Sequence, residues 1–218
     1  MPLNHQTLRT RQRELRDNFP ESLSLRVHRA LSWLHRAEKE TEDPDARFIF
    51  LWVAFNAAYA HDITDRQSFT ERKLFQGFLG RLIDSDTEQL LYESVWDHFS
   101  GAIRLLIDNQ FVFQPFWDYH IGQKTEEQWQ LAFQQSKSAA HRAMGRMDTQ
   151  KVMEVMFDRL YTLRNQLLHG GATWNSKVNR DQISNGVEIM GQVVPIVIYL
   201  MMNDHQRVWG DPSYPVIE

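Results

Sequence analysis

Arg164, Asn165 and His169 are the residues of this sequence whose types and spacing best fit chemistry. An imidazole can take up and return a proton near neutral pH. A guanidinium presents a planar fork of donors that can hold two oxygens of an anion. Proton transfer beside a bound anion is therefore the chemistry that these side chains allow. On spacing alone, a capping His and a surface Arg are the simpler interpretation.

These three residues lie at the end of a helix that the sequence predicts over 148–169. Its apolar residues recur at spacings of three and four, the pattern of a seam packed on neighbouring helices. They are Met153, Met156, Leu160, Leu163 and Leu167. At about 100° per residue, Asn165 and His169 lie above one another and Arg164 flanks them, away from that seam. The polar side chains are therefore expected to face solvent or a second subunit.

Helical periodicity runs through nearly the whole sequence, and strand alternation is almost absent. One helix is predicted from the break at Asp43-Pro44-Asp45 to Tyr59, and it is apolar nearly all round, as at the centre of a bundle. Others are predicted at about 20–39, 69–84, 87–108, 125–146 and 180–204, with an ordered aromatic connection at 109–124. The sequence thus predicts an all-α fold, with residues 1–218 as one domain and 65–147 as a possible helical insertion within it.

The bulk composition excludes several classes of function. A net charge of −4 and a pI near 6.1 argue against a protein that coats nucleic acid, because phosphate neutralisation needs an excess of cations. Residues 8–36 hold seven arginines, which form either a solvated helix face or a surface facing RNA. There is no phosphate-binding Gly-rich loop, dinucleotide fingerprint or His-Glu-x-x-His motif, so neither a cofactor nor a metal is predicted.

The composition also bears on location. The sequence has no cysteine, which removes disulfides and thiolate metal sites and fits a reducing compartment. Its first residues lack the apolar core of a signal peptide. The longest apolar run, Val193 to Met202, contains Pro195 and is too short to span a bilayer. A cytoplasmic protein without membrane association is therefore expected.

Two segments resemble the HEPN superfamily. The stretch Tyr161–Gly170 looks like its signature, in which Arg, a polar residue and three further residues precede His. The earlier stretch Phe48–Tyr59 is similar to the buried helix of the ApeA-like branch of that superfamily. The resemblance implies an antiparallel bundle of four core helices, here with extra helices. It also implies a homodimer in which the two motifs face each other across a cleft.

What the resemblance implies about function is a metal-independent endoribonuclease of toxin–antitoxin or antiviral defence systems. His169 would be the general base or acid, Arg164 the phosphate-binding cation, and Asn165 the group that orients a hydroxyl or the imidazole. RNA would be cut by attack of a ribose 2′-OH, leaving a 2′,3′-cyclic phosphate. An antitoxin or another defence protein would be a partner. Gly171 stands where silenced toxins of the superfamily carry a modified Tyr, so that form of silencing is excluded.

Weaker candidates for substrate binding surround the motif. Tyr161 lies one turn before Arg164, and Trp174, Lys177 and Arg180 follow the glycines, where they would stack on a base or hold a phosphate. Two alternatives stay open. One is a non-catalytic HEPN module that binds RNA, a nucleotide or a protein. The other is a plain helical interaction protein whose Arg and His only cap and solvate a helix.

Overall fold

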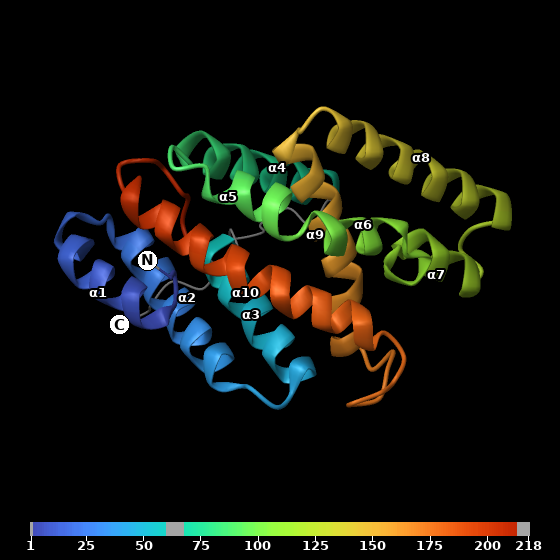
Figure 1. Ribbon diagram of the computed structural model, residues 1–218, viewed down its shortest axis with the longest axis horizontal. Coiled ribbons are helices and arrows are strands. Elements are labelled where there is room, and N and C mark those ends of the chain that lie inside the picture. The colour runs from blue at the N-terminus through green and yellow to red at the C-terminus, as the bar shows by residue number, and fades with distance from the viewer. Residues whose placement is uncertain (1, 60–67, 213–218) are drawn as a thin grey trace. The chain divides into compact units, whose positions relative to one another are not determined.

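The computed structural model describes residues 2–59 and 68–212, except for the side chains of residues 68–71. The regular elements in these ranges are helices, so the all-α class is confirmed (Figure 1). The chain divides into two compact units. Unit 1 comprises residues 1–90 and 190–218, and unit 2 comprises residues 91–189.

Unit 1 contains the helices at the two ends of the chain. They are α1 His5–Leu15, the 3-10 turn η1 Arg16–Asn18, α2 Glu21–Lys39, α3 Pro44–Tyr59, α4 Ser68–Ser85 and the part of α10 from Met190 onward. Helices α2 and α3 form a hairpin. As predicted, α3 is a core helix, and its buried apolar side chains are Phe48, Leu51, Trp52, Ala54, Phe55 and Ala58.

Unit 2 contains the helix that carries Arg164, Asn165 and His169. Its elements are α5 Leu90–Glu93, the π-helical turn η2 Ser94–His98, α6 Ser100–Asp108, the 3-10 turn η3 Gln110–Val112, α7 Gln114–His120, α8 Glu126–Gly145 and α9 Thr149–Leu168. The long helix α10 Arg180–Asn203 begins in unit 2. Helix α9 packs on α6 and α8, and α7 packs on α8 (Figure 1).

Two sequence predictions about the helices need correction. The helix expected over 87–108 is broken, because the chain takes a π-helical turn at Ser94–His98 and leaves helical geometry at Phe99 (φ −117°, ψ 9°). Helix α1 is a second difference, because no helix was predicted over its residues. That helix starts with a capping box between Asn4 and Thr7, a local signal that its largely polar sequence obscured.

Other predictions about elements hold. Helices α2, α4, α8, α9 and α10 lie within one or two residues of the expected ranges, and the aromatic connection 109–124 is ordered into η3 and α7. Pro195 lies inside α10 without ending it. The boundaries of unit 2 differ from the predicted insertion at 65–147. That residues 1–218 form one domain stays a prediction.

Helix α10 is the only described helix that is long and apolar enough to cross a membrane by length and composition. In the most apolar part of this helix, 72% of the residues are buried inside the protein. Helix α10 is thus mostly buried, as a core helix is. The cytoplasmic location stays a prediction.

Candidate functional site at the end of α9

Helix α9 is fixed at both ends by local interactions. The Asp148 side chain accepts a hydrogen bond from the backbone N–H of Lys151 at 3.0 Å, which satisfies one of the free donors at the helix start. The predicted seam is buried at Met153, Met156, Leu160 and Leu163, whereas Leu167 is only half-buried. The helix ends at Leu168, so Arg164 and Asn165 lie on its last turn and a half.

A buried cation also anchors α9, and no sequence pattern points to it. Arg159 is fully buried, its guanidinium lies 4.4 Å from the ring centre of Phe113, and Nη2 donates to Oγ of Ser136 at 2.9 Å. Burial lowers the pKa of Arg159 to about 10, against the opposing effect of the neighbouring Asp158 carboxylate. The contacts join α9 to α8 and to the residue after η3 within unit 2.

The structure brings Arg164 and Asn165 together. Nη1 of Arg164 donates to Oδ1 of Asn165 at 2.9 Å, and the guanidinium lies 5.5 Å from the ring centre of Tyr161. Both Arg164 and Asn165 are half-buried. The amide thus takes one donor of the guanidinium and restricts its orientation, so the planar fork is held close to the helix.

His169 is the residue that ends the helix, as the sequence predicts. Its backbone N–H donates to the carbonyl of Asn165 at 3.0 Å, and its φ and ψ of −97° and 12° leave the helix. The His169 side chain is exposed and makes no hydrogen bond or ion pair with any described residue. Asn165 was expected to orient either a hydroxyl or the imidazole, and the described residues show no contact of Asn165 with the imidazole. Both ring nitrogens of His169 are open to a ligand.

The two glycines after His169 have different roles. Gly170 has a φ of +70°, the left-handed conformation that ends many helices. The N–H of Gly171 donates to the carbonyl of Gln166 at 2.7 Å, and a Cβ at Gly171 would lie 3.2 Å from that oxygen. A side chain at this position would require the Gln166 backbone to shift by a few tenths of an ångström. A Tyr at position 171 would meet the same close approach to the Gln166 carbonyl.

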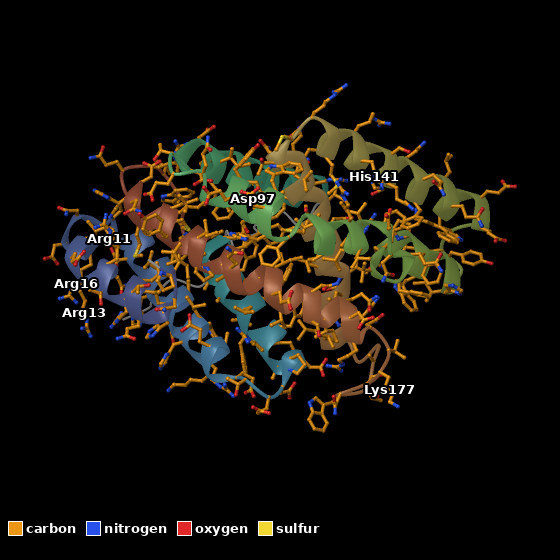
Figure 2. The ribbon with its side chains drawn as sticks, in the orientation of Figure 1. Arg11, Arg13, Arg16, Asp97, His141 and Lys177 are labelled. Carbon is orange, nitrogen blue, oxygen red and sulfur yellow. The ribbon has the colours of Figure 1, made fainter. Side chains whose placement is uncertain are left out.

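The weaker candidates have different surroundings. Tyr161 is half-exposed beside Arg164, and Trp174 is strongly exposed. Lys177 is exposed on the loop after α9 (Figure 2). Arg180 instead donates from Nε and Nη2 to the carbonyl of Ser176 at 3.1 and 2.8 Å, so it holds the loop. A role for any of them in binding substrate stays a prediction.

Gln166 is a further residue of the site, and it was not among the predicted site residues. Its Nε2 donates to the carbonyl of Phe111 at 2.6 Å, and its Oε1 accepts from Nδ2 of Asn179 at 2.7 Å. Gln166 therefore joins the last turn of α9 to η3, which contains Phe111, and to the loop that follows α9. No spacing pattern pointed to Gln166, because its partners lie 55 and 13 residues away.

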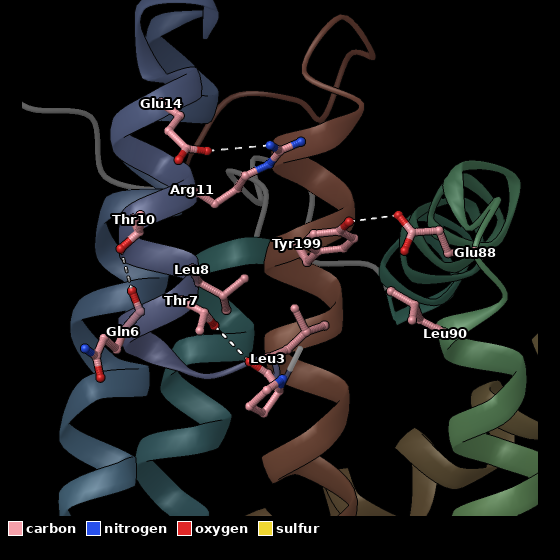
Figure 3. A pocket seen from close by; sticks show the side chains of 11 residues that line it. Leu3, Gln6, Thr7, Leu8, Thr10, Arg11, Glu14, Glu88, Leu90 and Tyr199 are labelled. Carbon is pink, nitrogen blue, oxygen red and sulfur yellow. Dashed lines mark hydrogen bonds and ion pairs between the residues drawn. The ribbon is translucent and has the colours of Figure 1, made fainter.

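A separate cavity of about 820 Å³ lies within unit 1 (Figure 3). Leu3 and Leu8 line it together with Tyr199, whose hydroxyl donates to Glu88 at 2.8 Å. That hydrogen bond, followed by burial, raises the pKa of Tyr199. None of the predicted site residues lines this cavity. The candidate site is therefore distinct from it and lies on the surface at the end of α9.

No protein-family model, no curated protein and no solved structure matches this chain. The HEPN resemblance therefore depends on the segments Phe48–Tyr59 and Tyr161–Gly170 alone. A proposal about function is therefore based on the local geometry of α9.

Proposed function

We propose that this chain is a metal-independent endoribonuclease of the HEPN type, with Arg164, Asn165 and His169 as its catalytic residues. The observation that carries the proposal is the pairing of an oriented guanidinium with an open imidazole. Arg164 is held by Asn165 at 2.9 Å, and His169 is exposed less than two turns further along the same helix. Such a pair can bind a phosphodiester and move a proton without a metal.

In the proposed reaction, His169 takes the proton from a ribose 2′-OH, and the 2′-oxygen attacks the adjacent phosphorus. The bond from phosphorus to the 5′-oxygen breaks, and the leaving oxygen receives a proton from a protonated His169 of either copy. Arg164 holds the non-bridging oxygens while charge grows on them. The products are a 2′,3′-cyclic phosphate and a 5′-OH.

The proposal includes a homodimer built on the HEPN-type four-helix core. Tyr161 and Leu168 are 48% and 47% exposed, and they lie seven residues apart on the face of α9 that carries Arg164. A second copy that covered this face would remove both side chains from water, which favours association. A second copy on this face would place two open imidazoles at one cleft. Restraint by an antitoxin or another defence protein belongs to the same proposal.

One observation favours a second candidate, a non-catalytic module that binds RNA, a nucleotide or a protein. The His169 imidazole has no orienting partner among the described residues, whereas general bases are commonly held by a second group. A binding module needs no such group. The same experiment separates the two candidates, because only the enzyme cuts.

The test compares the wild type with His169→Ala and Arg164→Ala on mixed tRNA and mRNA in the presence of EDTA. His98→Ala is the matched control, because His98 is an exposed histidine of unit 2 on a different element. We expect the wild type and His98→Ala to leave 2′,3′-cyclic phosphate ends and the two site variants to cut at least a hundredfold more slowly. If the folded wild-type dimer cuts nothing, or if the site variants cut as fast as the wild type, the ribonuclease proposal is contradicted. The non-catalytic binding module would then be the better candidate.

A further inference from the structure

The loop 170–179 after α9 has a fixed conformation, and Gln166 holds it at both ends. The Gly171 N–H donates to the carbonyl of Gln166 at 2.7 Å, and Asn179 Nδ2 donates to the Gln166 side chain at 2.7 Å. The same Gln166 side chain is itself held by the carbonyl of Phe111 at 2.6 Å. Both ends of the loop are thereby attached to one residue of α9.

The middle of the loop is held by its own hydrogen bonds. The carbonyl of Ser176 accepts two bonds from the Arg180 guanidinium, and its hydroxyl accepts from the N–H of Val178 at 3.1 Å. Asn175 and Asn179 both have a positive φ, at 53° and 62°, which fixes two tight turns. A loop with this many internal bonds loses little conformational entropy when it binds a ligand.

This fixed loop carries a large aromatic side chain into solvent. Trp174 is 75% exposed and Val178 is 66% exposed. Lys177 is also exposed (Figure 2). It makes no hydrogen bond or ion pair with the described residues. The Trp174 indole can therefore stack on a flat ring, and the Lys177 ammonium group can bind a phosphate.

The charge of this segment is also complementary to nucleic acid. Residues 164–180 contain Arg164, Lys177 and Arg180 and no Asp or Glu, although the chain as a whole has a net charge of −4. The candidate catalytic residue His169 lies in the same segment. An anionic ligand with flat apolar faces fits these features better than an apolar or acidic protein surface does.

We propose that the loop 170–179 is a binding site for single-stranded RNA, in which Trp174 stacks on an unpaired base and Lys177 binds a backbone phosphate. Gln166 is the positioning residue that fixes the loop. Single strands are specified because the bases of a duplex stack on each other and leave no face for an indole. The choice of RNA as the ligand rests on the proposed function of His169.

The binding test uses His169→Ala protein, so that no RNA is cut during the measurement. Fluorescence anisotropy with a fluorescein-labelled 12-nucleotide single-stranded RNA gives the dissociation constant. We expect Trp174→Ala to weaken binding about tenfold and Trp174→Phe to retain most of it, because Phe keeps a stacking face. Lys177→Ala should make log affinity depend less steeply on log salt, by about 0.7 in the slope, which is the value for one phosphate contact on a single strand. Trp33→Ala and Lys39→Ala, which change a part-exposed Trp and an exposed Lys of unit 1, should change neither quantity.

The role of Gln166 is tested through its partner with Asn179→Gly. Glycine accepts the φ of 62° at this position but removes the amide that bonds to Gln166. We expect trypsin to cleave faster after Lys177 in this variant. The dependence of log affinity on log salt should also become less steep by about 0.7, although Lys177 is still present. A residue that only supports the fold would not cause this change. An unchanged salt slope in Asn179→Gly would contradict the positioning role.

Two results would overturn the RNA-binding proposal. One is equal RNA affinity of the Trp174 variants and their parent, and the other is a change from dimer to monomer in Trp174→Ala, which would make the loop a protein interface. The outcome is separable from that of the cleavage test. Wild-type protein that cuts no RNA while binding depends on Trp174 would contradict the ribonuclease and support the binding loop.

Discussion

Arg164 and Asn165 are bonded side chain to side chain, with Nη1 of the guanidinium 2.9 Å from Oδ1 of the amide. They are sequence neighbours, and on a helix such neighbours point about 100° apart, so their contact needs the long Arg side chain to bend towards the amide. The pairing makes Asn165 a direct partner of the proposed phosphate-binding group. Replacing Asn165 by a charged residue and replacing it by an apolar residue should therefore have different effects on Arg164.

We expect Asn165→Asp to impair RNA cleavage more than Asn165→Ala. A carboxylate at this position would take the Arg164 guanidinium into an ion pair and repel the phosphate, whereas Ala only removes the amide oxygen that accepts from the guanidinium. The expected losses in kcat/KM are about a hundredfold for Asp and about tenfold for Ala. Single-turnover kinetics at low salt measure both, and equal losses would show that Asn165 does not act through Arg164.

Gly171→Ala should destabilise the protein. The new Cβ would lie 3.2 Å from the carbonyl oxygen of Gln166 and 3.3 Å from its Cα, both of which are backbone atoms of α9. We expect a loss of about 1 kcal/mol in the free energy of unfolding, measured in urea. The control is Gly101→Ala on α6, where a Cβ meets nothing within 4 Å and should be neutral or stabilising. Equal stability of the two variants would mean that the loop moves aside at little cost.

Arg159→Met and Arg159→Ala should differ in stability. The buried guanidinium of Arg159 has no hydrogen-bond partner at Nε, and burial holds its pKa at about 10. An apolar chain of similar length avoids the cost of the buried charge, so we expect Arg159→Met to change stability by less than about 1 kcal/mol. Arg159→Ala should cost about 3 kcal/mol, because a cavity forms beside Phe113. Thermal unfolding compares them, and a large loss in both variants would assign the stability to the charge itself.

Asp204 should make the stability of unit 1 depend on pH. A hydrogen bond from the Ser85 hydroxyl, and then the Arg207 guanidinium, lower the pKa of Asp204 below its usual 3.8 against the opposing effect of burial. Because the folded pKa is the lower one, the stabilisation is fully present above pH 3.8 and is lost as the pH falls through the folded pKa. We therefore expect Asp204→Asn to cost about 1 kcal/mol at pH 7.

The same comparison in acid provides the control for Asp204. Below the folded pKa, the wild-type carboxyl is neutral, so the difference in unfolding free energy between wild type and Asp204→Asn should shrink. Urea titrations at pH 7 and at a second pH well below 3.8 measure this difference. A difference that stays constant between the two pH values would assign the loss to the shape of the side chain and not to its charge.

The parts of the fold that sequence predicts well are those specified by neighbouring residues. Helix α9 follows from the spacing of Met153 to Leu163, the Asp148 cap and the following glycines, all within one segment. Helix α1 has the same kind of cap but few apolar residues, and periodicity alone did not reveal it. The π-helical turn at Ser94–His98 has no comparable sequence signal, so one predicted helix became two.

The sequence by itself determined that Arg164, Asn165 and His169 share the end of one helix and that glycines follow them. Those facts depend on intervals of a few residues and on the fixed geometry of a helix. Only the tertiary structure decided that Asn165 binds Arg164 and not the imidazole, and that Arg159 is buried against Phe113. It alone also placed Gln166 between Phe111 and Asn179. Side-chain rotamers and contacts between distant segments decide these features, and no local pattern encodes either.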